Sequence, residues 1–414
     1  MRASKAAVDG LPEGAAGSTT TLRTTSLGEA SPPTPSPARA HTSGSRAHAW
    51  AELLRLPALF TVPGDALAGA AAASARPTSR TLLAIASSLC LYEAGMALND
   101  WADRDVDAVE RPHRPLPSGR VHPAAALGAA CALTAAGLTL AACAGRPALT
   151  VAVPLAATVW AYDLALKDTP AGPFAMATAR GLDLLLGAAA TAGSEGLGEG
   201  TGVGRRSAVR GGTWTRGTLV PGALPGGIRQ ALPSAALLGT HTLAVTTVSR
   251  REAQGGSALA PFAALAATAS LTRTVARRRS LPSDRTGAGR SGHGSRDLAG
   301  PPRPADRAAA AVSRLPRPLR RPGPDSEPLD PHAALRLALA AAYATTTARS
   351  YLHATLNPSP PLTQRAVTAG IRATIPLQAA LAARSRTKSA TVTALLTTAL
   401  APLAGRFARK VSVT

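Results

Sequence analysis

Aromatic side chains are scarce in this 414-residue chain, where Phe, Trp and Tyr together make up only 3%. Proteins that bind single-stranded nucleic acid stack bases on such rings. The net charge of +22 therefore does not indicate a nucleic-acid partner, especially because the arginines are spread over tails and loops instead of forming one basic stripe. Basic loops beside anionic lipid headgroups give a simpler account of this charge.

Cysteine is also rare, and Cys90, Cys131 and Cys143 match neither a metal motif nor a disulfide framework. We interpret these three residues as small buried hydrophobes. The eight histidines do not cluster, and His241 lies in an apolar segment, where we expect a packed, hydrogen-bonded side chain. A Ser-His-Asp order, a phosphate-binding glycine loop and zinc-ligand spacing are all missing, so the common hydrolase, nucleotide and zinc sites are not predicted.

Long apolar blocks rich in Ala and Leu are present, although the mean hydropathy of +0.08 hides them. Most approach the roughly 20 residues that cross a bilayer core. They predict an all-α, multi-pass transmembrane helical bundle of about nine helices in the cell membrane. Nine or ten candidates are found, at 49–74, 81–101, 123–144, 148–166, 173–193, 231–249, 257–275, 332–353, 364–384 and 389–408.

The remaining segments set the domain organisation. Residues 1–47 are rich in Ser, Thr, Pro and Ala and lack the apolar core of a signal peptide, so we predict a disordered tail. Residues 48–410 form the predicted membrane domain. It is interrupted by two loops predicted to be flexible: 194–230, which is Gly-rich and basic, and 276–330, which is rich in Arg and Pro.

An aspartate run, Asn99-Asp100-x-x-Asp103-x-Asp105-x-Asp107, directly follows one apolar block. Each residue of a helix advances about 100°, so Asp103 falls near 300° and Asp107 near 340° when Asp100 is set at zero. Asp105 falls near 140°, on the opposite side. Three carboxylates therefore share one face, and Asn99 lies at its edge.

Three like charges at membrane depth repel one another, and ionisable groups there indicate function more often than a solvated helix end. Mg²⁺ resolves such repulsion, because it binds carboxylates together with substrate phosphates. A stiff, Pro-rich segment with three arginines follows at Arg111–Arg120. Arginine suits phosphate oxygens, so acids for a metal and cations for phosphate together predict a diphosphate site.

The run from Asn99 to Asp107, followed by Arg111-Pro-x-Arg114-Pro-Leu-Pro-Ser-Gly, resembles the first signature of the UbiA prenyltransferase family. Further resemblances to the family are a Tyr…Lys motif at Tyr162 and Lys167, and the next helix with Arg180 and Asp183. The resemblance implies an isoprenyl diphosphate substrate, Mg²⁺ as cofactor and an active site near one membrane face.

The resemblance also implies residue roles. It makes Asp100, Asp103 and Asp107 the Mg²⁺ ligands and, with Lys167, the catalytic residues. It assigns the diphosphate to Asn99, Arg111, Arg114, Tyr162, Lys167 and Arg250. Arg55 lies where the family often has an arginine in its first helix, and an anchoring role at the membrane surface is an equal alternative.

A second aspartate motif of the family is degenerate here. Its place holds the segment from Ser249 to Gly256, in which Glu252 is the one acid, beside Arg250 and Arg251. This departure resembles an EboC-like branch of the superfamily and makes a second Mg²⁺ doubtful. Either Arg250 or Arg251 replaces that metal charge, or Glu252 pairs with an arginine in a structural role.

The expected function is the Mg²⁺-dependent transfer of an isoprenyl group from its diphosphate to an aromatic or lipid acceptor. A membrane terpene cyclase of the same superfamily is an alternative, although the scarcity of aromatic rings disfavours it because such rings stabilise carbocations. A non-catalytic transporter or lipid-binding subunit is the third alternative, and the degenerate second motif favours it.

Overall fold

The computed structural model describes residues 43–55, 61–192, 224–250, 252, 255–277, 330–385 and 387–411. The chain in these ranges is mostly helical, with turns and short irregular connections between the helices, and no strand occurs in them. The predicted all-α class is therefore confirmed.

Twelve α-helices and one π-helical turn are found in the described residues. The α-helices are α1 (Ser43–Leu53), α2 (Val62–Ala72), α3 (Ser79–Ala102), α4 (Arg104–Glu110), α5 (Pro123–Ala144), α6 (Arg146–Ala161), α7 (Gly172–Ala192), α8 (Gly226–Ser249), α9 (Leu259–Ala276), α11 (Pro331–Leu356), α12 (Pro360–Ala382) and α13 (Lys388–Val411). The π-turn, η2, spans Tyr162–Leu166 and directly continues α6.

The first predicted helix, 49–74, was wrong, because it is two helices. Helix α1 ends at Leu53, and Arg55 adopts a left-handed backbone with φ of 50°, which interrupts a helix. Helix α2 then begins at Val62 with Pro63 in its first turn, a position that suits proline because it has no amide hydrogen to donate. The predicted count of nine helices is not confirmed.

Five helices are long and apolar enough to cross a membrane: α3, α5, α6 with η2, α8 and α9. They correspond to predicted segments, whose ends differ from the observed ones by at most five residues. Small residues dominate these helices, which allows their backbones to approach closely.

The predicted boundaries of the tail and of one loop were also wrong. Residues 43–47, assigned to the tail, form the start of α1, and residues 226–230, assigned to a loop, form the first turn of α8. Both segments mix small and polar residues, so the hydropathy pattern does not reveal their helical backbone. The rest of the tail and most of both loops lie outside the described residues.

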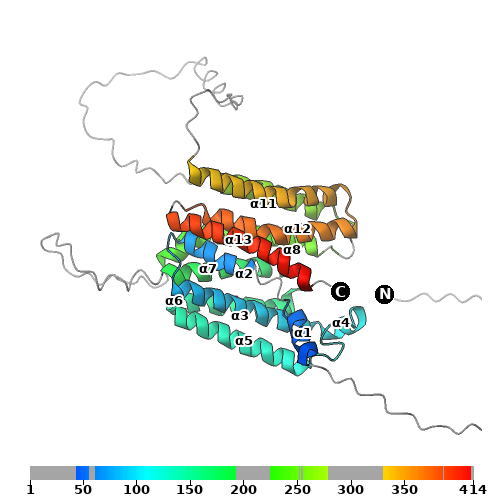
Figure 1. The fold of residues 1–414 in the computed structure, drawn as a ribbon. Helices are drawn as coiled ribbons and strands as arrows, with labels where there is room; N and C mark the ends of the chain where they lie inside the picture. The colour runs from blue at the N-terminus through cyan, green and yellow to red at the C-terminus, as the bar shows by residue number, and fades with distance from the viewer. Residues whose placement is uncertain are drawn as a thin grey trace, which may run out of the picture. The chain divides into compact units, whose positions relative to one another are not determined.

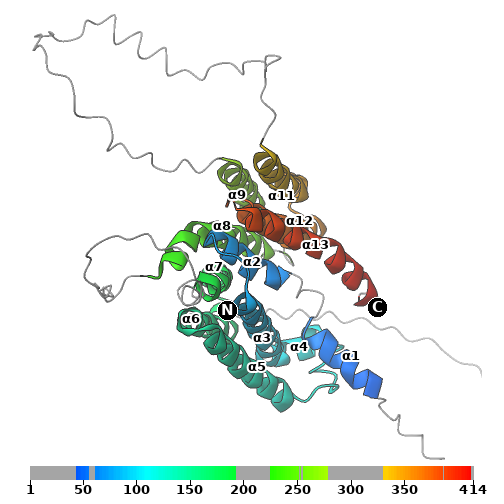
Figure 2. The ribbon, with the colours of Figure 1, turned by 60° about the vertical axis from the view of Figure 1, so that its left-hand side comes forward.

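The helices lie side by side, with their axes running in similar directions (Figure 1). Helix α7 packs against α2, α6 and α8, while α3 packs against α5. The last helices complete the bundle, because α12 packs against α2, α8, α11 and α13 (Figure 2).

Helices α2 and α7 approach each other through glycine. A Cβ atom added at Gly187 would lie 2.3 Å from the Cα and carbonyl oxygen of Ala66, and one added at Gly69 would lie 1.9 Å from the carbonyl oxygen of Leu184. Backbone therefore meets backbone at this crossing, which is a common way of packing membrane helices.

His241 is packed and hydrogen-bonded as predicted. It is 2% exposed, and its ring nitrogens lie 3.1 Å from the Tyr343 hydroxyl and 3.1 Å from the Gly370 carbonyl oxygen. The interpretation of the cysteines as buried was wrong, because Cys90 is only half-buried and Cys131 and Cys143 are exposed on α5.

Candidate functional site

The aspartate run lies where α3 passes into α4. Asp103 occupies the junction with helical dihedral angles, and the Asp107 amide donates a hydrogen bond to its carbonyl oxygen at 2.8 Å. The helical turn is therefore retained across the junction. Asp100 and Asp107 point inward and are 5% and 2% exposed, whereas the Asp105 side chain is 85% exposed.

Arginines surround the two buried aspartates. Arg114 Nη1 lies 2.7 Å from Asp107 Oδ2 and 3.6 Å from Asp100 Oδ1, so one guanidinium bridges both carboxylates. Arg111 lies 3.5 Å from Asp107, and Arg55 lies 3.1 Å from Asp100. The structure thus brings the Pro-rich segment and Arg55, two residues beyond the end of α1, to the same carboxylate face.

Lys167 reaches the third aspartate from the end of the π-turn. Its ammonium donates a hydrogen bond to Asp103, and its amide donates to the Tyr162 carbonyl oxygen at 2.9 Å. In a regular α-helix five residues would rotate Lys167 to about 140° from Tyr162. The wider i→i+5 turn instead places Lys167 above Tyr162, on the side of the aspartates.

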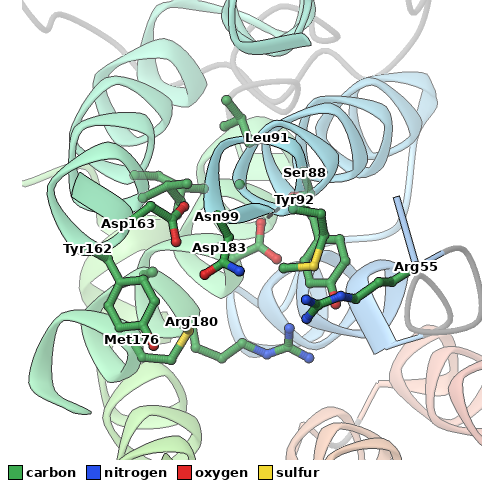
Figure 3. A pocket seen from close by; sticks show the side chains of 15 residues that line it. Arg55, Ser88, Leu91, Tyr92, Asn99, Tyr162, Asp163, Met176, Arg180 and Asp183 are labelled. Carbon is green, nitrogen blue, oxygen red and sulfur yellow. Dashed lines mark hydrogen bonds between the residues drawn. The ribbon is translucent and has the colours of Figure 1, made fainter. Parts of the chain in front are cut away.

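A cavity of about 240 Å³ opens beside this cluster. One part of its wall is apolar and includes Leu91, Met96, Leu155, Val159 and Met176. The polar part includes Arg55, Ser88, Asn99, Tyr162, Asp163, Arg180 and Asp183. Figure 3 shows Tyr162 and Asp163 entering the cavity from one side and Arg55 from the other.

Gly95 in α3 lets α6 and η2 come close to the cavity. A Cβ atom at this position would lie 2.9 Å from Val159 Cγ1 and 3.7 Å from Asp163 Oδ2. The absence of a side chain therefore sets the width of the cavity at the level of Asp163.

A buried polar network behind the cavity holds Arg180 in place. Its Nε atom lies 2.9 Å from Asp65 Oδ2, and Asp65 is fully buried in α2. The Gln378 amide, from α12, donates to Asp65 Oδ1 at 2.6 Å and to the Thr61 carbonyl oxygen at 2.7 Å. The sequence analysis included Arg180 but missed Asp65 and Gln378. An acid inside an apolar segment was the signal for Asp65.

Asp183, the other predicted acid of α7, is also buried, at 8% exposure. Its carboxylate accepts a hydrogen bond from the Ser88 hydroxyl on α3. The sequence analysis missed Ser88, which resembles many other small residues of these helices.

The residues of the degenerate second motif do not join the aspartates. Arg250 donates to the backbone carbonyl oxygens of Asp168, at 3.2 Å, and Thr169, and so ties α8 to the connection between η2 and α7. Glu252 accepts a weak hydrogen bond from the Ser249 hydroxyl at 3.4 Å. Neither Arg250 nor Glu252 lines the cavity.

The carboxylates of the aspartate run fit a Mg²⁺ ion that takes its remaining ligands from the substrate. Within the described ranges, no three His, Cys, Asp or Glu side chains lie close enough together to form a complete metal site. Mg²⁺ in proteins commonly takes only one or two carboxylates and completes its coordination with substrate phosphates and water. The oxygen donors of the aspartate run fit that arrangement, in which the substrate supplies the missing ligands.

These features define a polytopic helical membrane protein with an acid–base cluster beside a largely apolar cavity. Residues 58–274, more than half of the chain, match the UbiA prenyltransferase family. The chain belongs to this family. The EboC-like branch suggested by the degenerate motif stays a prediction.

The curated relatives include two archaeal proteins named digeranylgeranylglyceryl phosphate synthase. The protein from Methanopyrus kandleri is 36% identical over 127 residues, covering 30% of this chain and 45% of the relative. The protein from Methanothrix thermoacetophila is 37% identical over 107 residues, covering 26% of this chain and 40% of the relative. The chain thus spans less than half the length of these two relatives.

The solved apo structure of a UbiA homolog from Aeropyrum pernix K1 has a similar fold. It is 18% identical to this chain with a TM-score of 0.50, and the alignment covers 78% of this chain and 96% of the homolog. The fold is therefore shared over most of the bundle, well beyond the segment that matches the curated relatives.

Proposed function

We propose that this protein transfers an isoprenyl group from an isoprenyl diphosphate to an acceptor in the cell membrane, with Mg²⁺ as cofactor. The observation that carries the proposal is the set of ion pairs that Asp100, Asp103 and Asp107 form with four basic side chains beside a largely apolar cavity. Family membership supports the reaction class.

The donor diphosphate would bind at the aspartate face. Bound Mg²⁺ on these carboxylates supplies positive charge to the leaving diphosphate. Arg111, Arg114 and Lys167 now neutralise the aspartates, and their N–H groups are positioned to turn toward phosphate oxygens when the donor binds. Fixed cations of this kind stabilise the charge that develops as the allylic C–O bond breaks.

Tyr162 and Asn99 line the cavity next to this cluster. Both have N–H or O–H donors, so we assign them to hydrogen bonds with the diphosphate. The apolar wall formed by Leu91, Leu155 and Val159 then faces the first isoprene units, because hydrocarbon is favoured against such side chains.

A lipid acceptor is favoured over an aromatic one, because the curated relatives are named for the synthesis of a glyceryl phosphate lipid. A terpene cyclase is disfavoured, since Tyr92 and Tyr162 provide the only aromatic rings among the residues that line the cavity. A non-catalytic role is disfavoured by the complete set of acids and bases at the aspartate run.

The proposal is tested by the release of diphosphate from geranylgeranyl diphosphate by membranes that contain the full-length protein. We expect release that requires Mg²⁺ and stops when EDTA is added. Membranes from cells without the gene provide the control. If no isoprenyl diphosphate of any chain length releases diphosphate, the enzymatic function is ruled out.

Glu252→Gln is expected to leave turnover within about twofold of wild type, because one long hydrogen bond outside the cavity contributes little. Glu252 contacts Ser249 and lies outside the cavity. Diphosphate release by the variant at saturating Mg²⁺ checks this expectation. A large loss that higher Mg²⁺ restores would instead place a second metal ion at Glu252.

A further inference from the structure

Asp163 differs from every other acid around the cavity. It is 4% exposed, and its side chain lines the cavity from η2 (Figure 3). Asp100, Asp103 and Asp107 each pair with a cation, Asp65 pairs with Arg180, and Asp183 accepts a hydrogen bond. Among the residues that the structure describes, none donates a hydrogen bond to Asp163 or lies within ion-pair distance of it.

A buried carboxylate without a partner is costly. Its retention inside an apolar helix therefore points to a ligand that satisfies it. The space in front of Asp163 is the cavity itself, which Asp163 lines together with Gly95 and Asn99. A polar group of a bound molecule can enter this space.

Asp163 also has a specific position along the cavity. Lys167, at the end of the same π-turn, contacts the aspartate run, and Val159, one helical turn before Asp163, belongs to the apolar wall. Asp163 therefore lies between the diphosphate end and the hydrocarbon end. The reacting carbon of an isoprenyl diphosphate joins those two parts of the molecule.

We propose that Asp163 is a catalytic residue that removes the proton from a hydroxyl group of the acceptor, an inference that rests on the proposed prenyl transfer. The bond between the allylic carbon and the diphosphate oxygen breaks, and its electron pair stays on the diphosphate. A lone pair of the acceptor oxygen forms the new C–O ether bond. The O–H bond breaks, and its proton passes to the Asp163 carboxylate and later to water.

The test uses full-length protein in membranes, with geranylgeranyl diphosphate as donor and geranylgeranylglyceryl phosphate as the alcohol. Ether formation by Asp163→Asn is expected to fall about 100-fold or more, as general-base removal does. The KM for the donor should change little, because Asp163 does not hold the diphosphate. Asp163→Glu should recover part of the rate. Asp168 is an exposed acid nearby, and the control variant Asp168→Asn should retain the wild-type rate.

The pH profile separates proton removal from a structural role. The wild-type rate of ether formation should rise as Asp163 loses its proton, and this rise should be absent in Asp163→Asn. Equal rates and profiles in the two proteins would overturn the assignment. Wild-type protein that releases diphosphate yet forms no ether would also overturn it while leaving the donor half of the proposed function intact, whereas no diphosphate release at all would refute the proposed function itself.

Discussion

Asp103→Asn is expected to lower prenyl transfer at least about 100-fold, since loss of one preorganised electrostatic group in an active site has this effect. The substitution keeps the volume of the side chain and removes one charge from the proposed metal site. Lys167, which now donates a hydrogen bond to the Asp103 carboxylate, would then face a neutral amide. Diphosphate release at several Mg²⁺ concentrations is the measurement.

Asp105→Asn provides a matched control two residues away. The Asp105 side chain is 85% exposed and lies 3.5 Å from Arg104, a surface pair that contributes at most about 1 kcal/mol. The activity of Asp105→Asn should equal that of wild type, and both variants should insert into membranes normally. Full activity of Asp103→Asn, or an equal loss in both variants, would show that the site is elsewhere.

Gly187→Ala is expected to lower the free energy of unfolding by about 1–3 kcal/mol through overpacking. The new Cβ would lie 2.3 Å from backbone atoms of Ala66, and backbone cannot move aside as a flexible side chain can. Helix α2 must therefore shift, and Asp65, which precedes Ala66, would move away from Arg180. The midpoint temperature of thermal unfolding in detergent and the rate of diphosphate release should both decrease.

Gly128→Ala in α5 is the control for this substitution, because a Cβ atom there has no atom within 4 Å. Alanine favours the helix over glycine by about 1 kcal/mol, so the stability of Gly128→Ala should be unchanged or slightly higher. A Gly187→Ala protein as stable as Gly128→Ala would contradict the close crossing of α2 and α7.

Much of the fold could be predicted from the sequence because long apolar blocks have few alternatives in a bilayer. The inward face of the aspartate run also follows from local geometry, since a rotation of 100° per residue separates Asp105 from Asp100 and Asp107. The break between α1 and α2 could not be predicted from hydropathy, because the apolar residues Leu54, Leu59 and Phe60 run through it in the sequence. Pro63 was the local signal for the start of the second one.

Contacts between distant segments account for what the sequence did not reveal. Asp65, Arg180 and Gln378 meet in one network, yet Asp65 and Gln378 are 313 residues apart, and helical periodicity does not identify partners across such distances. The sequence analysis assigned no role to Asp163, because the family resemblance in this segment rests on Tyr162 and Lys167. Its unpaired state becomes visible only when the neighbouring helices are in place.

The bond between Gln378 and Asp65 has a consequence for the order of assembly during synthesis. At about 5–20 residues per second, ribosomes make α12 roughly 15–60 s after α2. Throughout this interval the Asp65 carboxylate lacks its amide partner, although Arg180 is made earlier and can already neutralise it. A nascent chain that stops before Gln378 therefore holds the Asp65 carboxylate through Arg180 alone, without the amide that bonds its second oxygen in the finished bundle.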